Sequence, residues 1–247
     1  MKRLFLFVFV SLLALGVGIV VSCGGDDDDN DSADDDASDD DATNELDISI
    51  CNPENVAFVT EIDNPFYPLA VGAQWVLEGE DDGEAVRVQI TVLDENEEVM
   101  GVNTQVIEER EWADDVLTEV SRNFFAQTEE GTVCYFGEDV DIYDDAGEEV
   151  VDHEGAWRAG DNEALPGIVM PAEPAVGQSY DQEYAPDVAL DHAEHESMGD
   201  TVEVPFGTFT DTLTVIETSP FDSGESLKQY ARGVGILVDE SIQLTAH

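Results

Sequence analysis

The chain has 247 residues, and its 59 Asp and Glu residues outnumber 8 Lys and Arg residues, which gives a formal net charge of -51. We therefore expect no nucleic-acid partner, because binding to phosphates requires a basic surface. Hydrophobic residues still make up 42% of the chain, which is typical of a globular protein, and the length suits one domain with appendages.

Residues 1–22 have the three parts of a secretory signal peptide. Lys2 and Arg3 precede an apolar run over residues 4–21, and small residues follow it. The sequence Val20-Val21-Ser22-Cys23 resembles the bacterial lipobox, in which the chain is cut just before the cysteine and the cysteine is acylated. The alternative is an uncleaved transmembrane helix, since the apolar run is near the lower length limit for a membrane span.

Lipidation of Cys23 predicts a protein that is anchored to the lipid bilayer but does not cross it. Several acyl chains hold a protein stably, because each buried methylene contributes about 0.8 kcal/mol. The next residue is Gly24 and not the Asp that resembles an inner-membrane retention signal. We expect an exported protein on the cell envelope, on the periplasmic or surface face of the outer membrane.

Residues 23–47 form an acidic stretch after the lipobox. Runs of Asp alternate with Gly, Asn, Ser, Ala and Thr, and apolar side chains are few. Such a segment cannot offset its ordering entropy, so the sequence predicts a disordered tether. The other interpretation is a tract that binds Ca²⁺ weakly and diffusely, because carboxylate oxygens suit that ion.

Residues 48–247 alternate apolar and polar side chains with a period of two. In residues 85–93, for example, Val86, Val88, Ile90 and Val92 share one face. Turn signals such as Asp82-Gly83 separate the runs, and such short spacing favours antiparallel neighbours. The pattern predicts one all-β domain of about ten strands, folded as an antiparallel barrel, half-barrel or sandwich.

Residues 154–177 break this rhythm with closely spaced glycines and prolines. The segment also carries Trp157, Ile168 and Met170, so it is too apolar for a solvated linker. A long loop inside a compact domain is usually functional or disordered. We expect a Gly/Pro-rich flap that closes one end of the sheet, or alternatively a lid that covers a ligand.

Several phrases from residue 62 onward resemble motifs of a family of uncharacterised secreted bacterial β-rich proteins and lipoproteins. They are Asn64-Pro65-Phe66-Tyr67-Pro68-Leu69 with Trp75, Tyr135-Phe136-Gly137-Glu138-Asp139, Pro166-Gly167-Ile168-Val169-Met170-Pro171-Ala172 with Val176-Gly177, Gln182-Glu183-Tyr184-Ala185-Pro186, Val204-Pro205-Phe206-Gly207-Thr208-Phe209, and Tyr230-Ala231-Arg232-Gly233-Val234-Gly235-Ile236-Leu237. The resemblance implies an exported β-rich domain and no known activity. Members often have an aromatic residue in place of Cys134, and Met and Val in place of His192 and His195.

Two cysteines remain if Cys23 is lipidated. Cys51 and Cys134 can form a disulfide in an oxidising compartment if the fold brings their Cα atoms within about 7 Å. Alternatively, Cys134 is a buried free thiol that fills an aromatic position of the family.

The densest group of metal-ligand residue types lies at residues 191–196. On a helix, His192 and His195 would lie one turn apart and could bind Zn²⁺ with Glu194 nearby. On a strand, His192 and Glu194 would share one face and His195 the other, as expected for a solvated charged strand. No nucleotide-binding loop, nucleophile elbow or zinc-protease motif occurs in the chain.

These features favour a noncatalytic binding or envelope module over an enzyme. The module would take up an apolar ligand, a glycan or a protein partner of the envelope, with no cofactor beyond weak Ca²⁺ or Zn²⁺ binding. An apolar cavity under residues 166–174 would support this function. The alternative is an exported hydrolase that uses carboxylates, with or without a metal, and that function requires a buried cleft with two acids in different environments.

Overall fold

The computed structural model describes residues 44–221 and 224–247. The predicted signal peptide, the lipidation of Cys23 and the tether up to residue 43 lie outside these residues. Within them, no helix is long and apolar enough to span a membrane. The described chain is nearly all β, as the alternating pattern predicts, with one 3₁₀ helix, η1 (Ile48–Cys51).

Nineteen strands occur in the described residues, and eight of them have only two or three residues. The strands are β1 (Glu45–Leu46), β2 (Phe58–Val59), β3 (Gln74–Asp81), β4 (Glu84–Val99), β5 (Val102–Ala113), β6 (Val116–Thr128), β7 (Val133–Tyr143), β8 (Val150–Asp152), β9 (Trp157–Arg158), β10 (Leu165–Met170), β11 (Ser179–Asp181), β12 (Glu183–Tyr184), β13 (His192–Met198), β14 (Val202–Val204), β15 (Gly207–Phe209), β16 (Thr212–Thr218), β17 (Glu225–Ala231), β18 (Gly235–Asp239) and β19 (Ile242–Ala246). The eleven longer strands are close to the predicted number, whereas the short ones carry too few residues to show a period.

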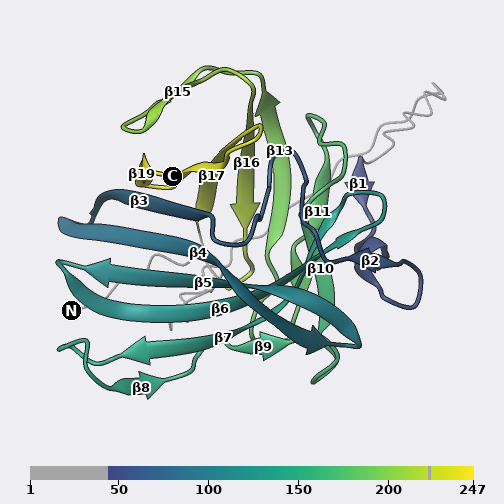
Figure 1. The fold of residues 1–247 in the computed structure, drawn as a ribbon, viewed down its shortest axis with the longest axis horizontal. Helices are drawn as coiled ribbons and strands as arrows, with labels where there is room; N and C mark the ends of the chain where they lie inside the picture. Colours follow the sequence, from purple (N-terminus) through teal and green to yellow (C-terminus); the bar gives the residue numbers. More distant parts are fainter. Residues whose placement is uncertain (1–43, 222–223) are drawn as a thin grey trace, which may run out of the picture.

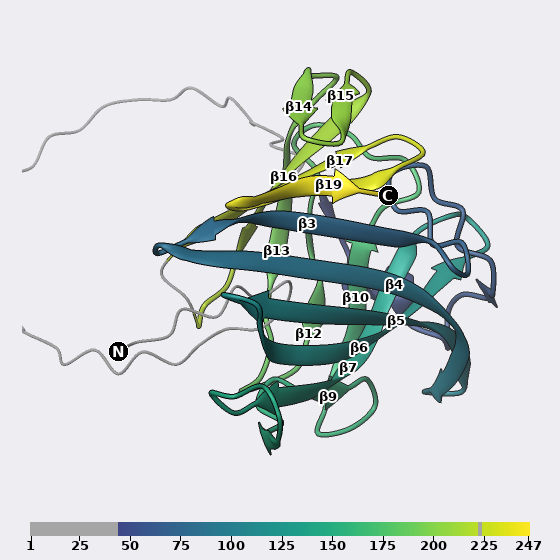
Figure 2. The same cartoon turned by 60° about the vertical axis from the view of Figure 1, so that its left-hand side comes forward.

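Seventeen of these strands form one strongly curved sheet, and β14 and β15 form a separate hairpin. Strands β3 to β7 are an antiparallel meander that crosses the molecule, and β13, β16 and β17 run steeply across its back (Figures 1 and 2). Strand β19 pairs with β3 and joins the two parts. The sheet is mixed, because β1 pairs with β11 in parallel. It curls around the core and does not close into a barrel, which is consistent with the predicted half-barrel or sandwich.

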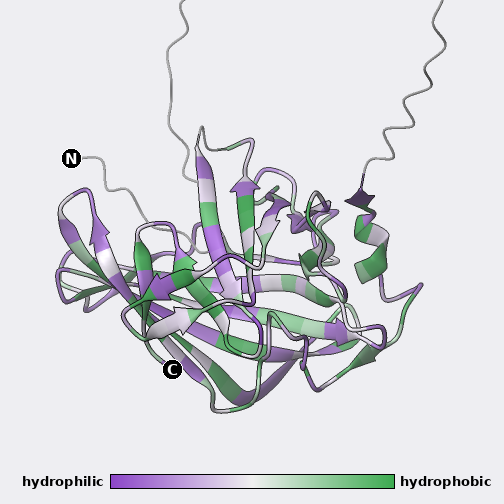
Figure 3. Cartoon of the chain, turned by 90° about the horizontal axis from the view of Figure 1, so that it is seen from above, coloured by the Kyte–Doolittle hydropathy of each residue, from purple (hydrophilic) through white to green (hydrophobic). Residues whose placement is uncertain are grey.

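The core lies on the concave side of this sheet. Trp75, Leu77, Val88 and Val92 point into it from β3 and β4, while the polar residues between them face outward. Hydrophobic and hydrophilic stretches alternate along the strands in Figure 3. Burial of one face on each strand fixes the register, since a shift of one residue would expose the whole apolar set.

Two parts of residues 154–177, at 157–158 and 165–170, are strands of the sheet and do not lie over it as a flap. Trp157 belongs to β9, and Ile168 and Met170 belong to β10, which pairs with β7 and β12; all three side chains are buried. Gly167 is required by close packing, because a Cβ atom there would lie 2.3 Å from the carbonyl carbon of Gln182. The glycine therefore marks a close approach between two chain segments and not a flexible loop.

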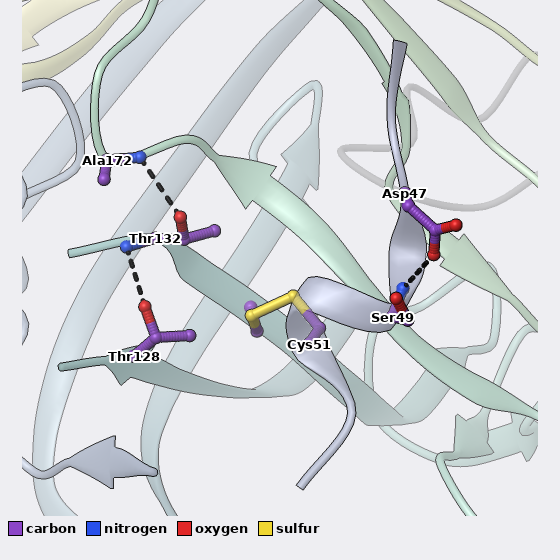
Figure 4. Close-up of a disulfide and its surroundings, with 7 residues drawn as sticks. Asp47, Ser49, Cys51, Thr128, Thr132 and Ala172 are labelled. Carbon is purple, nitrogen blue, oxygen red and sulfur yellow. Dashed lines mark hydrogen bonds between the residues drawn. A yellow bond between two sulfur atoms is a disulfide. The ribbon is translucent and has the colours of Figure 1, made fainter. Parts of the chain in front are cut away.

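A disulfide joins Cys51 in η1 to Cys134 in β7, with 5.7 Å between the Cα atoms (Figure 4). Cys134 is therefore not a free thiol. The Asp47 side chain caps η1 by accepting a hydrogen bond from the backbone N–H of Ser49, at 2.8 Å. The folded part includes β1, so it begins before residue 48, where the sequence pattern places the start of the domain.

Candidate ligand pocket on the concave face

A pocket opens on the concave side between the β3–β5 part of the meander and the β17–β18 hairpin. Its cavity volume is about 40 Å³, and the space around this cavity opens to solvent. Its wall is mainly aromatic and aliphatic, and its polar groups are Glu109, Lys228 and Asp239. The apolar lining consists of Tyr67, Pro68, Leu69, Trp75, Ile90, Ile107, Tyr230, Gly235 and Ile236. Small-molecule sites in proteins commonly combine an apolar lining with a few polar groups in this way.

The loop over residues 64–69 supplies one wall of the pocket, and Asn64 fixes its shape. The Asn64 amide nitrogen donates hydrogen bonds to the carbonyl oxygens of Gly131 (3.0 Å) and Pro171 (2.9 Å). Its side-chain oxygen accepts a hydrogen bond from the backbone N–H of Phe66, at 2.9 Å. A loop tied to two distant segments presents Tyr67 in a preformed position.

Trp75 forms a second wall and is held by its ring nitrogen. That nitrogen donates a hydrogen bond to the carbonyl oxygen of Val234, at 2.7 Å. Gly235 comes next in the chain with φ of +93°, and a Cβ atom there would lie 3.4 Å from the same ring nitrogen. A glycine at this turn adopts the left-handed conformation, which other residues rarely adopt.

Lys228 lies at the polar end of the pocket and is only 1% exposed. Its ammonium group forms an ion pair with a Glu217 carboxylate oxygen at 2.9 Å. Glu217 also accepts a hydrogen bond from the Gln182 side-chain amide, at 2.9 Å. Asp239 is the strand partner of Lys228 in the β17–β18 register. One buried cation thus lies among several carboxyl groups.

Glu109 and Asp239 differ from Glu217 in having no direct partner. They are 7% and 3% exposed, and neither carboxyl group forms a hydrogen bond or an ion pair within residues 44–221 and 224–247. Buried polar groups in folded proteins are normally paired, so two unpaired carboxyls on one pocket wall call for a physical explanation.

Burial controls the protonation of this group. It raises the pKa of Glu109 to about 8; Lys228 acts against this shift, and Asp239 and Glu119 add to it. Burial raises the pKa of Asp239 to about 6 against the effect of Lys228. Burial alone would lower the pKa of Lys228, but Asp239 and Glu217 together raise it. At neutral pH the pocket therefore presents a protonated Glu109, an ionised Asp239 and a charged lysine.

More acids continue along the concave side beyond the pocket. Burial raises the pKa of Glu111 to about 8 and that of Glu119 to about 7. The pKa values of the deeply buried Glu138 and Glu183 are also raised by burial. One carboxylate oxygen of each of these last two residues has no hydrogen-bond partner in the described part of the chain. The concave side of the sheet therefore carries several buried or half-buried carboxyls beside its apolar core.

The candidate metal ligands at residues 192–195 do not converge. Strand β13 turns His195 into the core and leaves His192 and Glu194 on the other face. His195 contacts the Tyr180 hydroxyl at 2.9 Å, and His192 contacts Asp181 at 2.9 Å. Within residues 44–221 and 224–247, no group of three or more His, Cys, Asp or Glu residues is placed to hold a metal ion.

The pocket residues were accessible to sequence reasoning only in part. Trp75 stands beside one of the family-like motifs, but the sequence patterns did not single out Glu109, Lys228 or Asp239. Two signals pointed to them. Lys228 is the only lysine after Lys2 and shares a strand face with Tyr230, and Glu109 shares a face with the buried Ile107. Period-two patterning thus places Glu109 and Lys228 on strand faces that also carry buried apolar or aromatic residues.

No protein-family model matches the chain, and no significant match occurs among curated proteins or among solved structures. The resemblance to secreted bacterial β-rich proteins therefore stays a prediction from the sequence motifs, and arguments about function depend on the pocket itself.

Proposed function

We propose that this chain is a membrane-anchored bacterial lipoprotein whose exported β domain is a noncatalytic binding module for a small, largely apolar ligand. The anchor rests on the lipobox-like residues 20–23, and the binding function rests on one observation, the preformed apolar pocket on the concave face. Walls held by Asn64 and Trp75 favour binding, since a rigid site loses little entropy when the ligand enters.

The anchor is tested by replacing the acylation site. The Cys23→Ser variant and the unchanged chain are expressed in a bacterial host with labelled palmitate, and the cell fractions are compared. We expect the label in the unchanged chain alone, together with retention of that chain in the membrane fraction. Equal labelling of both chains would contradict lipidation at this residue.

The pocket is tested with 2-phenylethanol, a neutral probe with a small apolar body. The full chain in zwitterionic lipid nanodiscs is titrated by calorimetry, and empty nanodiscs provide the background. Ile236→Trp should fill the pocket and remove binding, whereas Val151→Trp, on the exposed strand β8, should leave it unchanged. Equal binding by both variants, or no binding by the unchanged chain, would contradict the proposal.

An exported hydrolase is the second candidate, and the different pKa values of Glu109 and Asp239 favour it. One group is protonated and the other ionised at neutral pH, as an acid and a base would need to be. Binding remains the better proposal, because most of the residues that line the pocket are apolar or aromatic. Turnover of nitrophenyl glycosides that is lost in both Glu109→Gln and Asp239→Asn would favour the hydrolase.

A further inference from the structure

We infer that the pocket selects organic amines, that is, small ligands whose apolar body ends in an ammonium group placed against Glu109 and Asp239. This inference rests on the proposed binding function and adds the charge and chemical class of the ligand. It follows from three properties of the described residues: the unpaired carboxyls, the charge around Lys228 and the aromatic walls.

The carboxyls of Glu109 and Asp239 lie near one cation, Lys228, whose ammonium is ion-paired with Glu217. Glu109 and Asp239 line the pocket and are more than nine-tenths buried, yet neither has a hydrogen-bond or ion-pair partner among the described residues. The cost of removing these two groups from water has already been met when the chain folds. An incoming ammonium therefore bears only its own desolvation and gains two partners at fixed positions.

The charge around Lys228 argues against an anionic ligand. Its ammonium is already paired with Glu217. Asp239 adds a second negative charge, and Glu109 adds another when it ionises. A carboxylate ligand would bring another negative group into this cluster and would have to compete with Glu217 for the lysine. The surplus of acids over bases in the whole chain also attracts cations and repels anions.

The aromatic walls suit a cation with an apolar body. Tyr67, Trp75 and Tyr230 line the same pocket as the two acids. Aromatic ring faces attract ammonium groups within about 6 Å, and the rings also bury hydrocarbon. Ile90, Ile107 and Ile236 complete the apolar surface. A ligand with an aromatic or short aliphatic body and one amine matches both the acidic groups and the apolar walls of the pocket.

Binding of an ammonium should release a proton. Glu109 is largely protonated at neutral pH, so it must ionise to pair with the ligand, and its proton leaves to the solvent. The charged or titratable groups that act on Glu109 or respond to it are Lys228, Asp239, Glu119, Glu111, Glu138, Tyr67 and Tyr135. Affinity for the amine should therefore rise between about pH 6 and 8, as ionisation of Glu109 becomes easier.

The experiment compares 2-phenylethylamine, 2-phenylethanol and phenylacetate, which share an aromatic body and differ in head group. Each is titrated into the full chain in zwitterionic nanodiscs at pH 7.5, with empty nanodiscs as background. We expect the amine to bind about tenfold more tightly than the alcohol, the anion to bind least, and protons to be released only with the amine. Buffers with different ionisation enthalpies measure that release.

The matched variants are Glu109→Gln and Glu111→Gln, which remove the same charge from neighbouring positions on one face of β5. Only Glu109 lines the pocket. Glu109→Gln should lower amine affinity to that of the alcohol and abolish proton release, while Glu111→Gln should change neither by more than about twofold. Equal affinities for amine and alcohol would overturn the amine inference and leave the binding function intact. Absence of binding by all three probes would overturn both.

Discussion

Raising the pH from about 6.5 to 8 should destabilise the folded domain, because several buried carboxyls must then lose protons that the fold retains. Burial raises the pKa of Glu109 and Glu111 from 4.5 to about 8 and that of Glu119 to about 7. A group with a raised pKa stabilises the folded state below its unfolded pKa, and this contribution is lost as the pH rises through the folded value.

The pH window is chosen so that His195 does not mask the effect. Burial lowers the pKa of His195 from 6.5 to about 4, so this residue opposes folding only as the pH falls below its unfolded value. Above pH 6.5 or so, the unfolded chain has ionised glutamates and a neutral histidine. The raised carboxyls, which also include the deeply buried Glu138 and Glu183, then dominate the difference in bound protons between the folded and unfolded states.

The magnitude follows from the number of protons that the folded state retains. Each retained proton changes the free energy of unfolding by about 1.4 kcal/mol per pH unit. Glu109, which is more deeply buried than Glu111 and Glu119, gives a loss of about 2 kcal/mol over the window. Full contributions from the half-buried Glu111 and Glu119 would bring the loss to about 4 kcal/mol, and solvent screening reduces their share.

The assay is urea unfolding of the full chain at three pH values across this window, at constant ionic strength. The free energy of unfolding should fall steadily, and Glu109→Gln should make the decline shallower and stabilise the domain at the upper pH. A free energy that stays flat or rises with pH in the unchanged chain would refute the reasoning. An unaltered slope in the variant would show that Glu109 is not one of the groups responsible.

Three further predictions concern stability and are measured by urea or thermal unfolding. Replacing Cys51 and Cys134 by alanine should cost about 4 kcal/mol, because the disulfide closes a loop with a sequence separation of 83, and an unchanged midpoint would contradict this. Gly167→Ala should cost about 3 kcal/mol or more through its backbone clash, whereas Gly207→Ala, with no neighbour closer than 3.7 Å, should be nearly neutral. Lys228→Met should cost about 3 to 5 kcal/mol at pH 7.5, since it leaves buried carboxylates without their cation, and less at pH 5; equal losses at both pH values would count against this explanation.

Two glycines, Gly167 and Gly83, show why local sequence signals misled in one segment and succeeded in another. In the sequence, Gly167 indicates a break in regular secondary structure. It nevertheless lies in the buried strand β10, where contact with the backbone of Gln182 requires the absence of a side chain. This contact depends on how β10 and the segment around Gln182 pack together in the folded sheet, and a local sequence pattern cannot show such packing. By contrast, the Asp82-Gly83 turn between β3 and β4 depends on neighbouring residues alone, and the sequence predicted it correctly.

The sequence by itself determined the all-β class and the faces of the longer strands, because a period of two is a local property of an extended chain. The sequence also identified Cys51 and Cys134 as a possible disulfide pair, but it left open whether they are bonded. Tertiary structure alone decided that pairing, the open curved shape of the sheet and the pocket. Lys228, Glu109 and Asp239 come from strands β17, β5 and β18, and only the curvature of the sheet brings them around one space. The protonation states of these three residues depend on their burial between the strands, so no single strand determines them.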